Sequence, residues 1–200
     1  MESFLIYLKL GFEHITDING YDHILFILAL CIIYSIREWK RVLILVTAFT
    51  LGHSLTLGLA VLEIINVDSA LIEFLIPVTI ILTCLANVMG YKHRTISRTN
   101  YEPSNIYAQY ALAVIFGLIH GMGFSNYLKS LLGKGESIVL ELFAFNLGLE
   151  IGQLLIVGGS FVLALLFLEL INVRRSTWVM VCSGFIAGLS FHLLMEKWYF

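Results

Sequence analysis

The 200-residue chain is 59% hydrophobic and only 13% charged, whereas soluble domains carry roughly a quarter of charged residues. A soluble domain of this size could not bury so much apolar surface, so the composition predicts a protein solvated by the lipid bilayer. The formal net charge of −2 is too small to indicate a nucleic-acid partner. The three cysteines lie inside apolar runs, which indicates buried thiols and argues against a disulfide framework or a CxxC metal site.

The chain begins with an apolar segment, residues 1–16, that is too short to cross a membrane. It lacks a basic start and a small-residue cleavage site, so we expect a short interfacial helix followed by an uncleaved first span. Six longer apolar runs follow, near 22–37, 42–63, 69–90, 106–128, 139–168 and 176–195. Because the backbone must satisfy its own hydrogen bonds in lipid, these runs are predicted to be helices. The sequence therefore predicts a single all-α transmembrane domain over residues 1–200, a bundle of about six spanning helices.

Basic residues gather in alternate connections between these runs. Eight follow the first, third and fifth runs: Arg37, Lys40, Arg41, Lys92, Arg94, Arg98, Arg174 and Arg175. The remaining four fall on the other side: Lys9, Lys129, Lys134 and Lys197. The positive-inside bias predicts a multi-pass protein of the inner (plasma) membrane with both termini extracytoplasmic.

A few ionisable residues lie inside or at the edge of the runs, where charge is costly and usually functional. They are His14, Asp22, His23, His53, His120 and Glu150. At about 1.5 Å per residue, His53 lies about 18 Å and His120 about 21 Å from the predicted cytoplasmic edge. Glu150 lies about 15 Å from the opposite edge. The six residues are thus expected to converge on the outer half of the membrane.

Polar stripes give some helices a face that suits a neighbour or a watery cavity. Asn146, Glu150 and Gln153 repeat at helical spacing in the fifth run, and a second stripe, Thr79–Thr83–Asn87, follows one face of the third. A single intramembrane amide or histidine is often only an interhelical hydrogen bond. Three imidazoles and two carboxylates at similar depth favour a divalent metal site instead. Mixed nitrogen and oxygen ligands suit Ni²⁺, Co²⁺ or Zn²⁺ better than Cu⁺, and the spacing does not select among these ions.

Four segments occur in order on four of the predicted helices. They are GFEHITDINGYDHILFILAL, FTLGHSLTL, FGLIHGMGF and FNLGLEIGQL, within residues 11–155. Together they resemble the HupE/UreJ family of small membrane proteins. The resemblance implies a hydrogenase or urease accessory protein that admits nickel or cobalt. It carries a metal-handling role onto six residues of this chain: His14, Asp22, His23, His53, His120 and Glu150.

The leading hypothesis is a permease or binding protein for a divalent metal ion, with the lipid bilayer and the ion as its partners. There is no GxxxxGK[ST] motif, so a gradient or a partner would supply the drive. An intramembrane zinc hydrolase is a second hypothesis, because three histidines and a carboxylate can hold zinc and activate water. A b-type haem protein with axial histidines is a third. A transporter is favoured over an enzyme, and the sequence leaves a homo-oligomer open.

Overall fold

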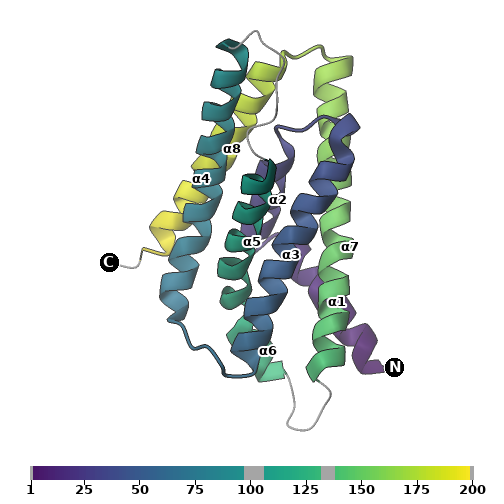
Figure 1. Ribbon diagram of the computed structural model, residues 1–200, viewed down its shortest axis with the longest axis vertical. Coiled ribbons are helices and arrows are strands. Elements are labelled where there is room, and N and C mark those ends of the chain that lie inside the picture. The colour runs from purple at the N-terminus through teal and green to yellow at the C-terminus, as the bar shows by residue number, and fades with distance from the viewer. Residues whose placement is uncertain (1, 97–105, 132–137, 199–200) are drawn as a thin grey trace.

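The computed structural model describes residues 2–96, 106–131 and 138–198, and every regular element in these ranges is helical (Figure 1). The first three helices are α1 (Glu2–Thr16), α2 (Asp22–Cys31) and α3 (Trp39–Val61), with a short 3₁₀ turn η1 (Ile36–Glu38) before α3. The others are α4 (Ser69–Ile96), α5 (Ile106–Gly123), α6 (Ser125–Leu131), α7 (Ile138–Leu165) and α8 (Arg175–Glu196). A π-helical turn, η2 (Leu166–Leu170), extends α7.

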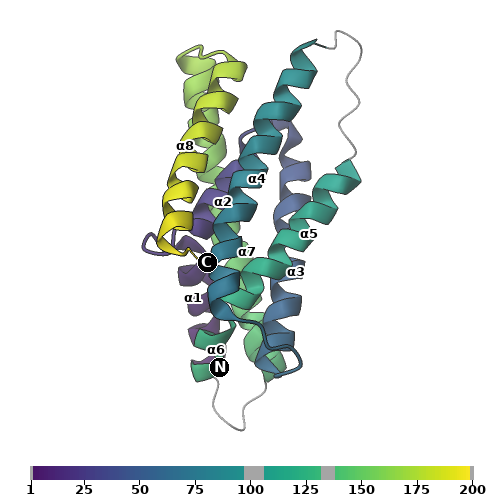
Figure 2. The ribbon, with the colours of Figure 1, turned by 90° about the vertical axis from the view of Figure 1, so that its left-hand side faces the viewer.

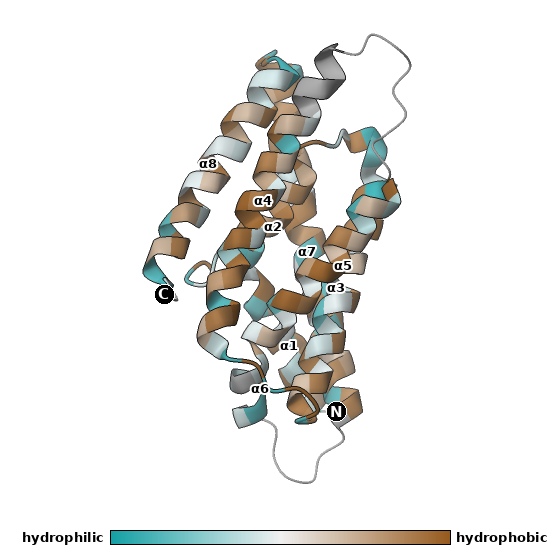
Figure 3. Cartoon of the chain, turned by 60° about the vertical axis from the view of Figure 1, so that its left-hand side comes forward, coloured by the Kyte–Doolittle hydropathy of each residue, from teal (hydrophilic) through white to brown (hydrophobic). Residues whose placement is uncertain are grey.

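Five of these helices are long and apolar enough to cross a membrane. They are α3 with its preceding turn, α4, α5, α7 with η2, and α8. Their middle parts are mostly hydrophobic or neutral (Figure 3). The all-α membrane fold is therefore confirmed, with five long helices where six spans were expected.

The difference lies in the first predicted span, 22–37. Helix α2 has only 10 residues and so covers about 15 Å, half of the hydrocarbon core. The other half is α1, which was expected at the interface but packs along the first half of α7. Ile15 and Thr16, at the end of α1, lie against Gly152, near the middle of the α7–η2 rod. The chain therefore breaks its helix at residues 17–21 and places Asp22 and His23 at mid-height, not at the outer end of a span.

The broken stretch is a local turn that the sequence encodes. The Asp17 carboxylate accepts a hydrogen bond from the backbone N–H of Asn19 at 2.9 Å, an Asx turn that ends the helix. Asp22 then opens α2, where a carboxylate suits the positive end of the helix dipole. Non-helical backbone at membrane depth is tolerated only where protein or a water-filled cavity surrounds it.

Glycines bring the helices together in two close pairs, α1 with α7 and α3 with α5, and α5 crosses α3 obliquely (Figure 2). In the α1–α7 pair, a Cβ added at Gly148 would collide with the carbonyl of Leu8. In the α3–α5 pair, a Cβ at Gly117 would collide with the carbonyl of Phe49, and one at Gly121 with that of His53. Small residues of this kind let helix backbones approach closely in membranes. The second pair fixes the distance between the two helices that carry His53 and His120.

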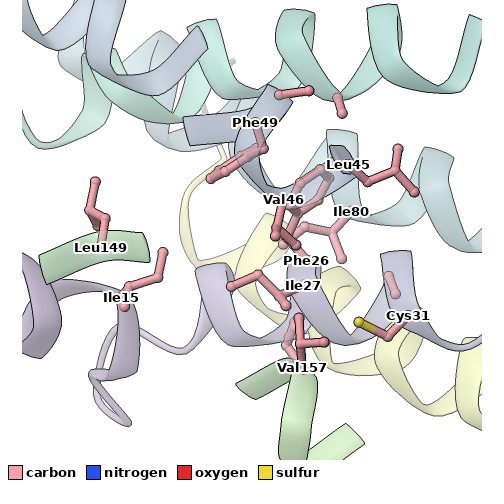
Figure 4. Packing of buried hydrophobic residues seen from close by; sticks show 14 of the residues in the cluster. Ile15, Phe26, Ile27, Cys31, Leu45, Val46, Phe49, Ile80, Leu149 and Val157 are labelled. Carbon is pink, nitrogen blue, oxygen red and sulfur yellow. The ribbon is translucent and has the colours of Figure 1, made fainter. Parts of the chain in front are cut away.

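Buried apolar side chains from α2, α3 and α4 fill the centre of the bundle (Figure 4). Phe26, Phe49 and Ile80 lie side by side there, each no more than 1% exposed. Ile15 faces Leu149 where α1 meets α7. The core therefore holds α2 between the two glycine-bearing pairs.

One end of the bundle, which we call the basic end, carries Arg37, Arg41, Arg174 and Arg175. Arg175 donates a hydrogen bond to the carbonyl of Ile33 at 2.9 Å and so joins the start of α8 to the segment after α2. The N-terminus and the α3–α4 connection lie toward the opposite end (Figure 1).

Candidate metal centre

Four histidines from four different helices meet where the first span is broken. His14 lies in the last turn of α1, His23 in the first turn of α2, His53 on α3 and His120 on α5. The ring centroid of His23 lies 4.6 Å from that of His14, 5.8 Å from His53 and 5.0 Å from His120. His53 and His120 are completely buried, and His23 is 4% exposed. The fold therefore joins into one cluster residues that are up to 106 positions apart in the sequence.

Three of these side chains already approach the geometry of a metal site. One ring nitrogen from each of His14, His23 and His53 lies within 4.8 Å of the other two. Nitrogen ligands of a tetrahedral ion lie about 3.3 Å apart, as Zn–N bonds of 2.0–2.1 Å require. Small rotamer changes would therefore bring the three imidazoles onto one ion.

The histidine cluster also contains buried nitrogens that have no hydrogen-bond partner among the described residues. Five buried imidazole nitrogens lack a protein partner among the described residues: Nε2 of His14, Nε2 of His23, both ring nitrogens of His53, and Nδ1 of His120. A buried polar atom without a partner costs roughly 1–3 kcal/mol, so five in one cluster call for an occupant that satisfies them. A cation bound by neutral imidazoles, or water, has the required chemistry.

Asp22 orients one of the histidines. Its Oδ1 lies 2.8 Å from Nδ1 of His23 and also accepts the backbone N–H of His23 at 2.7 Å. A carboxylate at Nδ1 holds the proton there and leaves Nε2 free as a lone-pair donor, as in carboxylate–histidine–metal arrangements. In this structure Asp22 therefore positions His23 and is not one of the three clustered donors.

His120 faces a different partner. Its Nε2 lies 3.0 Å from the hydroxyl of Thr79 on α4, and its other nitrogen is among the five without a partner. Phenylalanine rings close the sides of the cluster: the ring centroid of Phe124 lies 3.8 Å from that of His14, and that of Phe49 lies 5.2 Å from that of His120. These rings place apolar surface beside the imidazoles, where charge interactions are stronger than in water.

A pocket of about 190 Å³ leads to the cluster from the end opposite the basic end. Its lining includes the three carboxylates of Asp17, Asp22 and Glu73 together with His14, His23 and His120. Lys197 stands at its edge, where Nζ lies 3.8 Å from Glu73. We call this opening the acidic mouth.

Glu150, the sixth predicted ligand, lies apart from the three clustered donors. Its carboxylate accepts a long 3.5 Å hydrogen bond from Thr47 on α3, while Thr50 donates to Gln153 at 2.9 Å. Thr47 and Thr50 precede His53 by six and three residues, so this polar seam between α3 and α7 lies toward the basic end from the cluster. His192 also lies outside the histidine cluster. It is exposed, and its Nδ1 lies 3.7 Å from Oε1 of Glu196 on α8.

Sequence reasoning did not connect three residues with the site. Thr79 was noticed only as part of a stripe, and its spacing could not identify His120 as its partner. Phe124 ends the FGLIHGMGF segment and Lys197 was counted among the basic residues, but neither was given a role at the site, because apolar rings are common in a membrane protein and a lysine suits any interface.

The comparison with known proteins agrees with this description of the chain. The family model described as "HupE / UreJ protein" matches residues 1–200, the whole chain. No curated protein and no solved structure matches this chain.

Proposed function

Because the chain belongs to the HupE/UreJ family, we propose that this multi-pass membrane protein is a permease or binding protein for a divalent transition-metal ion, with nickel or cobalt as its substrate. The observation that carries the proposal is the set of five buried imidazole nitrogens, without protein partners among the described residues, that meet in one cluster. Imidazole is a ligand that suits Ni²⁺, Co²⁺ and Zn²⁺. His14, His23 and His53 would bind the ion first, and His120 stands beside them.

The two ends of the bundle support a direction of entry. Carboxylates line the acidic mouth, and a cleft lined by one sign of charge concentrates ions of the opposite sign. The arginines of the basic end favour the cytoplasmic side of an inner membrane. The ion would thus enter from the extracytoplasmic side, where both termini would lie, and lose part of its hydration shell as the imidazoles bind it.

Uptake by proteoliposomes tests the proposal directly. Purified protein reconstituted into liposomes is expected to accumulate nickel or cobalt above empty liposomes, and the His53→Ala/His120→Ala variant is expected not to. Equal accumulation by wild type and this variant would overturn the permease. Elemental analysis of the purified protein then identifies the ion that it retains.

Asp22→Asn is expected to weaken nickel binding by roughly 10–100-fold, the usual cost of losing a carboxylate behind a histidine ligand. The amide no longer holds a proton on Nδ1 of His23 as a carboxylate does, so the tautomer that exposes Nε2 is less favoured. Isothermal titration in detergent measures the affinity. Asp17→Asn is the matched control, because Asp17 lines the mouth but bonds the backbone of Asn19. If both variants bind equally, Asp22 has no positioning role.

Metal binding is expected to weaken as the pH falls, because imidazole binds a metal ion only in its neutral form. Protons compete with the ion for the same lone pairs, so the affinity should fall by up to about tenfold per pH unit for each proton displaced. Titrations at constant ionic strength from pH 8 down to the lowest pH at which the protein stays folded check this. An affinity that does not change over that range would argue against histidine ligands.

A zinc hydrolase is the second candidate, because three histidines backed by a carboxylate also match catalytic zinc sites. Zinc that stays bound through purification, without any uptake into proteoliposomes, would favour it. A b-type haem has less support, because the rings of Phe26, Phe49 and Phe124 pack against the imidazoles where a flat macrocycle would have to lie.

A further inference from the structure

A second, larger cavity lies on the far side of the cluster from the acidic mouth. It has a volume of about 650 Å³ and lies between α2, α3, α4 and α5. Its lining reaches Tyr34 just after α2, Gly90 on α4 and Ala108 near the start of α5. These parts of the helices face the basic end. At about 30 Å³ for each water molecule, the space would hold on the order of 20.

A polar stripe connects the metal centre to this cavity. Thr79, Thr83 and Asn87 repeat every four residues along one face of α4. Thr79 contacts Nε2 of His120 at 3.0 Å, and Thr83 bonds to the carbonyl of Thr79 at 2.8 Å. Thr83 and Asn87 both line the cavity. A chain of neutral oxygen atoms therefore leads from the cluster toward the basic end.

Two hydrogen bonds hold the far part of the cavity in place. Asn87 donates to the carbonyl of Ala29 at 2.7 Å, and the Tyr34 hydroxyl donates to the side-chain oxygen of Gln109 at 2.7 Å. The second bond joins the segment after α2 to α5, across the cavity. The lining residues described by the structure have no ionised side chain, and most are apolar. A site that an ion must leave has to bind it weakly, and neutral oxygens among apolar walls do so.

We propose that this cavity is the inner vestibule of the permease, through which the ion leaves the histidine cluster along Thr79, Thr83 and Asn87 toward the basic end. The inference rests on the proposed function and adds to it the path by which the ion leaves the histidine cluster. The metal centre lies between an acidic mouth and a neutral vestibule, so the ion is captured by charge and released where charge is absent. The Tyr34–Gln109 hydrogen bond is placed to act as the last barrier before the basic end.

Cysteine labelling tests whether the vestibule holds water. Ala86 on α4 and Ala111 on α5 are both exposed, but only Ala86 lines the cavity. In membrane vesicles with the basic end facing outward, a cationic, membrane-impermeant thiol reagent should modify Ala86→Cys at least about tenfold faster than Ala111→Cys, because the reactive thiolate forms in water and not in lipid. Labelling of the native cysteines is subtracted. Equal rates at the two positions would overturn the vestibule, and slow rates at both would identify a groove filled by lipid.

Transport by matched variants separates the vestibule from the proposed function. Ala86→Phe should lower nickel uptake at least about fivefold by filling the cavity, while its affinity for nickel in detergent stays within about twofold of the wild type. Ala111→Phe should change neither. If the wild type takes up nickel and Ala86→Phe does so equally well, the vestibule is wrong and the permease stands. If the wild type takes up no metal, the permease itself is wrong, and the labelling rates still decide whether water fills the cavity.

Discussion

His53→Leu is expected to abolish the stabilisation of the protein by nickel and, at the same time, to raise the stability of the metal-free protein. His53 is completely buried, and neither of its ring nitrogens has a partner among the described residues. Removing a ligand should weaken binding by more than the roughly 10–100-fold that loss of a supporting carboxylate costs. Leucine has a similar volume and no polar atoms, so the cost of about 1–3 kcal/mol for an unsatisfied buried polar group disappears.

Thermal unfolding in detergent, with and without nickel, measures both effects. His192→Leu is the control, because that histidine is exposed and lies outside the cluster. The control should keep the full response to nickel. A His53→Leu variant that nickel stabilises as much as the wild type would show that the cluster is not the binding site, whatever its own stability.

Gly117→Ala is expected to destabilise the protein by about 1–3 kcal/mol or more, the usual cost of overpacking. The added methyl would collide with the backbone carbonyl of Phe49, which cannot move aside as a flexible side chain could. Helices α3 and α5 must then separate, and His53 moves away from His120. Nickel affinity should fall together with the melting temperature.

Gly184→Ala provides the matched control, because no atom lies within 4 Å of a Cβ at that position on α8. Alanine is a better helix former than glycine by roughly 0.5–1 kcal/mol, so this variant should melt at the same temperature or higher. If Gly117→Ala has the same melting temperature as Gly184→Ala and keeps its affinity for nickel, the close α3–α5 contact does not hold the site together.

The sequence was informative wherever periodicity and burial act locally. The long apolar runs predict the helices, because each run must satisfy its backbone within itself in lipid. The similar heights of His53 and His120 were predicted from their depth along separate helices, whereas His23 reaches them only because the first span is broken. Depth along a helix axis does not fix the direction in which a side chain points, however, and for that reason Glu150 was expected beside the histidines.

The broken first span could not be read from periodicity. Residues 1–16 and 22–31 are both apolar, but only their packing along α7 shows that they form two halves of one crossing. The short DINGY turn between them has a composition typical of a helix cap at the membrane surface. The turn lies inside the protein because α1 packs against Gly148 and Gly152 of α7. These glycines lie more than 120 residues later in the chain.

The division of the first crossing into α1 and α2 has a consequence for biogenesis. Neither the 15 residues of α1 nor the 10 residues of α2 are long enough to form a stable crossing as they leave the ribosome. The surface that seats α1 belongs to α7, which is synthesised after most of the chain. His14 and His23 can therefore take their places only when the C-terminal half has entered the bilayer. A nascent chain that stops before α7 would lack the surface that seats α1, so the histidine cluster can form only after α7 has been synthesised.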